Sequence, residues 1–229
     1  MEDEITKHTR KIVSAARTPG HSFAARIKEI FIEVAIIVFA VSLSIWFHNR
    51  SEYQREQTAV RDFLTDVTAD LRADIAAMET EQQNQQRVVA KYSRLLQISG
   101  ARADSVDASP TPLTLALNPA LRTTNDGIYE GFKSGGKIGL IEDRQVKQLM
   151  LTYYQQKMKA LDKSESYYNA AVERLTRFTG YMNFHTMSAD REWKPTLDFI
   201  IQYAAIDIHN YSDAIHMAND IIAAIAQHP

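Results

Sequence analysis

Hydrophobic residues run almost without interruption between residues 27 and 48, where polar positions are few. From Ile30 to Phe47, twelve of eighteen residues are Ile, Leu, Val or Phe, and Glu33 is the only charge. Eighteen helical residues span about 27 Å, close to the roughly 30 Å of a hydrocarbon core. The large apolar residues favour insertion by about 5 kcal/mol, whereas a central carboxylate costs about 3 kcal/mol. We therefore expect a transmembrane helix at residues 27–48.

Two other interpretations of this segment fit the sequence less well. A core helix of a soluble protein should have a polar face, and residues 36–41 have none. A cleavable signal should end in a small-x-small site, but Ala40 and Ser42 fall inside the apolar run and Trp46 closes it. Trp46 and His48 are expected at the second membrane interface. Glu33, near the first interface, is either a functional group inside the membrane or a snorkelling boundary residue.

Apolar residues recur at helical spacing through most of the remaining chain. A long juxtamembrane helix is expected at residues 49–99, where polar Asp74, Glu81 and Gln85 interrupt the apolar stripe. The Gln-rich run at residues 79–86 is expected to be an exposed or water-filled part of this helix, with disorder as the alternative. The stripe consists of Leu64, Val67, Leu71, Met78, Val88, Tyr92 and Leu95.

Residues 100–120, with three prolines, form the one predicted linker. A short helix is expected from Thr123 to Phe132, a glycine-rich turn follows, and further helices start near Asp143 and Pro195. The later stripes comprise Val146, Met150, Tyr153, Leu161, Tyr168, Val172, Leu175, Phe178 and Met182, and then Leu197, Ile201, Ala204, Ile208, Tyr211, Ile215, Ala218, Ile222 and Ile225. The predicted fold is all-α: one membrane helix and a bundle over residues 121–229 that the 49–99 helix completes.

Composition narrows the function classes. A net charge of -2 gives no basic surface for nucleic acid, and the absence of cysteine removes thiolate metal sites and Cys nucleophiles. "GFKSGGKI", residues 131–138, resembles a phosphate-binding loop, but Ile138 stands where that loop needs Ser or Thr. We therefore expect no bound nucleotide, no cofactor and no catalytic residues.

Four polar residues lie on one face of the predicted last helix, at spacings of four, three and four: His209, Asp213, His216 and Asp220. Imidazole and carboxylate groups in such a row can bind zinc or iron when another helix supplies further ligands. The apolar stripe lies to one side of the row, so the more ordinary interpretation is a solvated polar face.

Charges on either side of the apolar segment bear on its orientation. Six Lys and Arg residues precede Ile30, where the apolar run begins, and three follow it closely, at Arg50, Arg55 and Arg61. Positive charge is retained in the cytoplasm, so we expect a cytoplasmic basic leader at residues 1–26 and an exported C-terminal domain. The leader is also expected to contact anionic headgroups.

Two stretches of the chain, residues 25–60 and 120–160, share a set of spaced positions with known sequences: Glu29-Ile30, Ala40 and Trp46 in the span, then Tyr129, Ser134-Gly135-Gly136, Leu140-Ile141 and Tyr153-Tyr154. At these positions the chain resembles an uncharacterised family of bacterial single-pass membrane proteins, known only as a domain of unknown function. The resemblance implies a bacterial inner-membrane anchor and a helical extracytoplasmic domain, and it implies no activity.

These features together indicate a membrane-anchored helical protein that acts by binding. We expect an interaction or scaffold protein that self-associates or binds a membrane protein, because long striped helices beside a span favour oligomers. Two alternatives stay open: an extracytoplasmic helical bundle that senses a ligand, and a metal-binding protein that uses the His209–Asp220 row.

Overall fold

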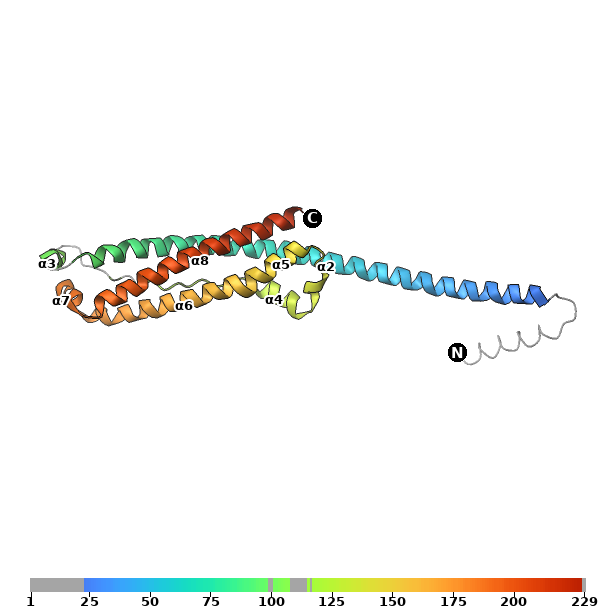
Figure 1. Ribbon diagram of the computed structural model, residues 1–229, viewed down its shortest axis with the longest axis horizontal. Helices are drawn as coiled ribbons and strands as arrows, with labels where there is room; N and C mark the ends of the chain where they lie inside the picture. Colours follow the sequence, from blue (N-terminus) through green and yellow to red (C-terminus); the bar gives the residue numbers. More distant parts are fainter. Residues whose placement is uncertain (1–22, 99–100, 108–114, 116, 228–229) are drawn as a thin grey trace. The chain divides into compact units, whose positions relative to one another are not determined.

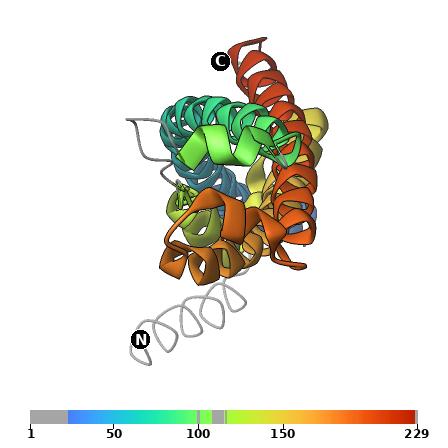
Figure 2. The same cartoon turned by 90° about the vertical axis from the view of Figure 1, so that its left-hand side faces the viewer.

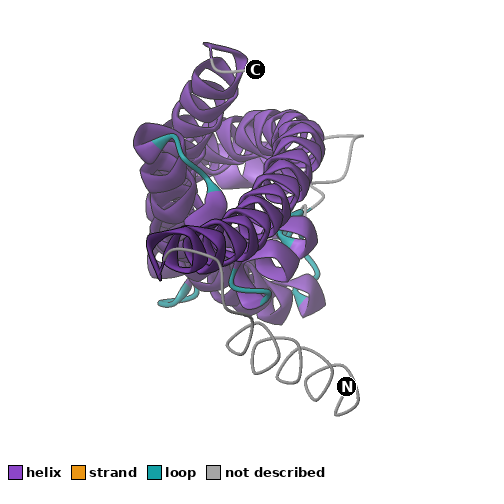
Figure 3. Cartoon of the chain, turned by 90° about the vertical axis from the view of Figure 1, so that its right-hand side faces the viewer, coloured by secondary structure: helices purple, strands orange, loops and turns teal. Residues whose placement is uncertain are grey.

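The computed structural model describes residues 23–98, 101–107, 115 and 117–227. Within these residues the chain is helical and contains no strand, which confirms the predicted all-α fold (Figure 3). The helical elements are α2 (Phe23–Leu96), α3 (Ala101–Asp107), α4 (Gly127–Ser134), η1 (Lys137–Leu140), α5 (Arg144–Thr152), η2 (Tyr153–Lys157), α6 (Met158–Leu175), η3 (Thr176–Gly180), α7 (Phe184–Ala189) and α8 (Trp193–Gln227).

The predicted membrane helix and juxtamembrane helix belong to one continuous element, α2. The chain nevertheless divides into two compact units, residues 1–56 and 57–229. Most of the predicted basic leader lies outside the described residues, which begin at residue 23. In the first unit the described side chains from Ile27 to Arg55 are all exposed.

The second unit is a bundle of long helices that run side by side (Figure 1). One is α2 from Gln57 onward, the second is the uninterrupted run of α5, η2 and α6, and the third is α8. The Gln82 amide of α2 donates to the Ile208 carbonyl at 3.1 Å and to the Ser212 hydroxyl at 2.7 Å, both on α8. Seen from the end, the long helices lie around one another, and α3 and α7 lie at the end that faces the viewer (Figure 2). The Gln-rich run at residues 79–86 is helical, since it lies within α2.

Residues 117–126, which we call the strap, lie before α4 and belong to no helix or strand. Asn169 of α6 holds the strap by accepting from the Ala120 N–H at 2.7 Å and donating to its carbonyl at 3.0 Å. The predicted helix start at Thr123 is therefore wrong, because strap residues bond to other helices and α4 begins only at Gly127. The predicted linker ends in the strap and begins with α3, while residues 108–114 and 116 lie outside the described residues.

Helix boundaries elsewhere follow from local chemistry. The Asp143 carboxylate accepts from the N–H groups of Gln145 and Val146 and so caps α5, which begins where the sequence predicts a helix start. Gly136 has φ of 71°, the one left-handed residue of the described chain, and turns it between α4 and η1. Met182 is wholly exposed although it continues the predicted third stripe, because α6 ends at Leu175.

Two hydrophobic clusters fill the bundle, and a polar layer separates them along every long helix. On α2 the first cluster ends at Met78 and the second begins at Val88, with buried Gln85 between. The same break occurs at Ser164 and Glu165 on α6 and at Asp207 on α8. We use "polar layer" for Gln85, Ser164, Glu165 and Asp207. Polar groups buried in a bundle core are costly unless they are paired, so this layer is a candidate for function or for specificity.

A short π-helix, η2, interrupts the run from α5 to α6. It buries two consecutive tyrosines, Tyr153 and Tyr154, which a regular helix would turn about 100° apart. The Tyr154 ring stacks on Tyr129 of α4 with centroids 4.1 Å apart. This insertion thereby fixes α4 against the bundle, and such insertions are frequent at functional sites.

Candidate functional site

Most of the exposed large hydrophobic side chains of the described chain lie in the segment at residues 27–48 of α2. It is the one described helix that is long and apolar enough to cross a membrane, and none of its apolar window is buried. Phe31 is 76% exposed and Phe39 67% exposed, so neither packs as a core residue would. Exposed apolar patches of this extent mark sites of membrane or protein contact.

The sequence-predicted residues of this segment also lie on its surface. Glu33 is exposed among apolar neighbours. Trp46 packs edge to face on Phe47, with ring centroids 5.0 Å apart. His48 lies 3.9 Å from the Glu52 carboxylate one turn later, and both side chains are largely exposed. An aromatic pair followed by a polar, charged turn is the arrangement expected where a helix leaves the hydrocarbon.

The His209–Asp220 row lies on the outer surface of α8. Asp213 pairs with Lys157 of η2 at 2.7 Å, and His216 contacts Asp220 at 3.0 Å. The Lys157 ammonium lowers the pKa of Asp213. Among the described residues, no group of three His, Cys, Asp or Glu side chains is placed to hold a metal ion. The structure therefore pairs the row with Lys157, a cation, and brings no further metal ligand from another described helix to it.

An ion-pair network ties the strap to the polar layer. The Arg122 guanidinium donates to Glu165 at 3.0 Å and to Asp162 at 2.6 Å, and its own side chain is 1% exposed. The Tyr211 hydroxyl of α8 donates to the same Glu165 carboxylate at 2.7 Å. Burial acts to lower the pKa of Arg122, but the two carboxylates outweigh it and raise that pKa. The strap, α6 and α8 thus converge on one carboxylate.

Asp207 is the least satisfied member of the polar layer. It is fully buried, and neither carboxylate oxygen has a hydrogen-bond partner within the described chain. The nearby Ser164 hydroxyl donates instead to the Leu161 carbonyl. Burial raises the pKa of Asp207 to about 7; the Ser164 hydroxyl opposes that shift, and the Glu165 carboxylate adds to it. Burial of this carboxyl therefore favours its neutral, protonated form.

Gln85 completes the layer from α2, and its Oε1 also lacks a partner among the described residues. It borders a cavity of about 270 Å³ whose other walls include Tyr168 and strap residues. A polar cavity of this size has room for water molecules, which can satisfy buried polar groups.

Asp74 lies one cluster away and anchors the start of α4. Its carboxylate accepts from the Asn125 backbone at 3.1 Å and side chain at 2.8 Å, and from the Tyr153 hydroxyl at 3.4 Å. Burial raises the pKa of Asp74, and the Asn125 hydrogen bonds oppose that shift. The interruption of the α2 stripe at Asp74 is therefore a point of attachment for the strap and for Tyr153 of η2.

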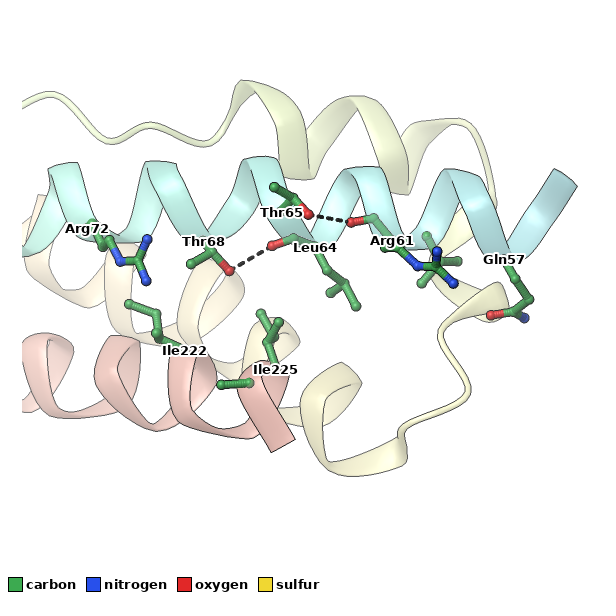
Figure 4. A pocket seen from close by; sticks show the side chains of 10 residues that line it. Gln57, Arg61, Leu64, Thr65, Thr68, Arg72, Ile222 and Ile225 are labelled. Carbon is green, nitrogen blue, oxygen red and sulfur yellow. Dashed lines mark hydrogen bonds between the residues drawn. The ribbon is translucent and has the colours of Figure 1, made fainter. Parts of the chain in front are cut away.

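A groove of about 530 Å³ lies between α2 and the end of α8 (Figure 4). Its apolar walls come from Leu64, facing Ile222 and Ile225 across the groove (Figure 4). Arg61 and Arg72 of α2 lie toward its two ends, and neither guanidinium has an acidic partner in the part of the chain that the structure describes. Sequence reasoning did not find this groove, because it depends on how α8 approaches α2.

Comparison with known proteins gives no precedent for this arrangement. No protein-family model, no curated protein and no solved structure matches the chain. The resemblance to a family of bacterial single-pass membrane proteins is thus still a prediction. The functional interpretation must come from the exposed segment, the polar layer and the groove themselves.

Proposed function

We propose that this chain is a single-pass membrane protein whose helical bundle acts by binding, as an interaction or scaffold domain in a membrane complex. One observation carries the proposal: eighteen consecutive residues with twelve large apolar side chains are exposed along α2. Leaving such side chains in water costs about 1.5–3 kcal/mol each relative to burial, so they require a cover.

A lipid bilayer is the cover that best fits the segment. Its length matches the hydrocarbon core, and a helix satisfies its own backbone groups there. Trp46 and His48 follow the apolar run at the position of an interfacial belt. Glu33 lies one turn inside the other end, from where a carboxylate can reach the headgroups.

The proposed orientation has a cytoplasmic N-terminus and an exported bundle at a bacterial inner membrane. The support is the excess of Lys and Arg before the segment, six against three, together with the family resemblance.

We also propose that the chain self-associates, but through a different surface from the helix stripe that the sequence suggested. The α2 stripe that favours a coiled coil is occupied within the chain, because Val67, Leu71 and Met78 are fully buried. A contact between copies would therefore use the span or outer surfaces of the bundle. Two anchors held in one membrane lose much less entropy on pairing than free domains do.

The test is membrane extraction and protease access on the full chain with a C-terminal tag. We expect the tag to stay with membranes through alkaline carbonate and to be cleaved by protease added to intact spheroplasts. The matched control replaces Ile37 and Phe39 by Asp, which should release the chain into the wash, since each central Asp costs about 3 kcal/mol. A tag that is retained but protected would place the bundle in the cytoplasm. Wild-type protein in the carbonate wash would refute the anchor.

A further inference from the structure

The groove between α2 and α8 combines an apolar floor with two arginines that have no acidic partner among the described residues, and the proposed anchor does not use this combination. Arg61 and Arg72 are eleven residues apart on one helix, which is about 16 Å of helical rise. Leu64 projects between them toward Ile222 and Ile225 (Figure 4). The groove therefore suits a ligand that is apolar along its length and anionic at an end.

Other occupants fit these features less well. A second copy docked groove to groove would bring its own Arg61 and Arg72 against the same cations. An amphipathic protein helix of three turns and about 10 Å diameter fills on the order of 1,200 Å³, more than twice the volume of the groove. A volume of about 530 Å³ is instead typical of sites for small organic ligands, which hold about 300–1,000 Å³.

Length and charge both match a lipid with one acyl chain. Half of a hydrocarbon core of about 30 Å is one acyl-chain length, close to the separation of the two arginines. A guanidinium binds phosphate through two parallel hydrogen bonds, which fixes the headgroup. A second acyl chain would have no room beside the first.

We propose that this groove binds a single-chain anionic phospholipid, with its acyl chain on Leu64, Ile222 and Ile225 and its phosphate on Arg61 or Arg72. Such a ligand would join α2 to the end of α8 and so report on the lipid composition around the protein. The inference does not require the anchor, because single-chain lipids also reach a site through water.

The test uses the full chain in phosphatidylcholine nanodiscs with the photoreactive residue p-benzoylphenylalanine at Ala226, an exposed position that lines the groove. The probes are 1-oleoyl lysophosphatidate, lysophosphatidylcholine and oleate, and intact mass gives the yield of each adduct. We expect lysophosphatidate to crosslink about tenfold more than either other probe. The same probe at Ala90, exposed on α2 outside the groove, should give no such preference.

Charge variants assign the preference to the groove. Arg61→Gln with Arg72→Gln should lower the lysophosphatidate adduct to the level of lysophosphatidylcholine, whereas Arg87→Gln, an exposed arginine elsewhere on α2, should not. All three arginines are exposed, so these variants should fold. An equal yield for all probes, or an equal loss with Arg87→Gln, would overturn the proposal. An oleate adduct as abundant as that of lysophosphatidate would also overturn it, because it would indicate a fatty-acid site. A protein-sized adduct on irradiation of cells would overturn it as well, because it would indicate a protein partner in the groove. If the carbonate test refutes the membrane anchor, the same crosslinking comparison carried out in buffer still tests whether the groove binds the lipid.

Discussion

Arg122 of the strap donates to Glu165 of α6 at 3.0 Å, and the arginine side chain is shielded almost completely from water. Tyr211 of α8 uses the same carboxylate, so three segments depend on one ion pair. Buried charges are stable in a protein only when they are paired, and removing one partner leaves the other without compensation.

Replacing Arg122 by Met should therefore destabilise the bundle strongly. We expect the free energy of unfolding to fall by about 3–5 kcal/mol, because Glu165 stays buried without its cation. Urea unfolding of the full chain, followed by near-ultraviolet circular dichroism, measures the change. Lys133→Met, which breaks an exposed pair with Glu130, should lower the free energy of unfolding far less, because exposed ion pairs contribute little. Equal losses in the two variants would mean that the Arg122 pair does not hold the strap.

The buried Asp207 predicts how stability depends on pH. Its pKa rises from an ordinary 3.8 to about 7, so the folded state binds this proton more tightly than the unfolded state does. The contribution of this proton to the free energy of unfolding is fully present below about pH 4 and is lost as the pH rises toward 7. It amounts to about 4 kcal/mol at most. Asp74, whose pKa is also raised, acts in the same direction.

The melting temperature of the wild-type chain should therefore be higher at about pH 5 than at about pH 8. Asp207→Asn should flatten this dependence, because the amide cannot ionise, and should raise the melting temperature at the higher pH. Asp198→Asn, at an exposed position of the same helix, is the matched control and should retain the wild-type slope. A wild-type slope in Asp207→Asn would show that other groups govern the titration.

The helices of the bundle could be predicted because their signal is local. Leu71 and Met78 on α2, and Val146 and Met150 on α5, recur at the helical period and are buried. The strap could not be predicted in this way. Its conformation depends on partners about 40 to 50 residues away, such as Asn169, and its own residues follow no period.

Only some members of the polar layer could be predicted from the sequence. Gln85 interrupts a clear apolar stripe on α2, whereas Asp207 falls outside the stripe that was assigned to α8 through Ile208. The structure places the centre of that stripe one residue earlier, with Ile200, Ala204, Asp207 and Tyr211 fully buried. Where apolar residues are dense all around a helix, a difference of one residue decides whether a polar side chain counts as surface or core.

The outer row of α8 gives a prediction about metal binding. Asp213 is paired with Lys157, and His216 with Asp220, so we expect zinc to leave the melting temperature of the purified chain unchanged. His216→Ala should change the free energy of unfolding by less than about 1 kcal/mol, because exposed ion pairs contribute little. A rise in melting temperature with zinc that is absent in His216→Ala would instead support the metal-binding alternative.

Glu33 tests whether the apolar segment does more than anchor. A carboxylate one turn inside the bilayer can reach the interface, so Glu33→Gln should leave carbonate-resistant membrane association unchanged. If Glu33 contacts a partner within the membrane, the same variant should lower the recovery of crosslinked complexes, since an uncharged amide forms weaker hydrogen bonds. Glu29→Gln, one turn earlier, is the matched control for loss of a charge near the interface. Ala40→Glu should reduce membrane association, because a carboxylate at the centre of the span costs about 3 kcal/mol. Complex recovery that is equal for wild type, Glu33→Gln and Glu29→Gln would make Glu33 a boundary residue, whose side chain reaches the headgroups and carries no contact of its own.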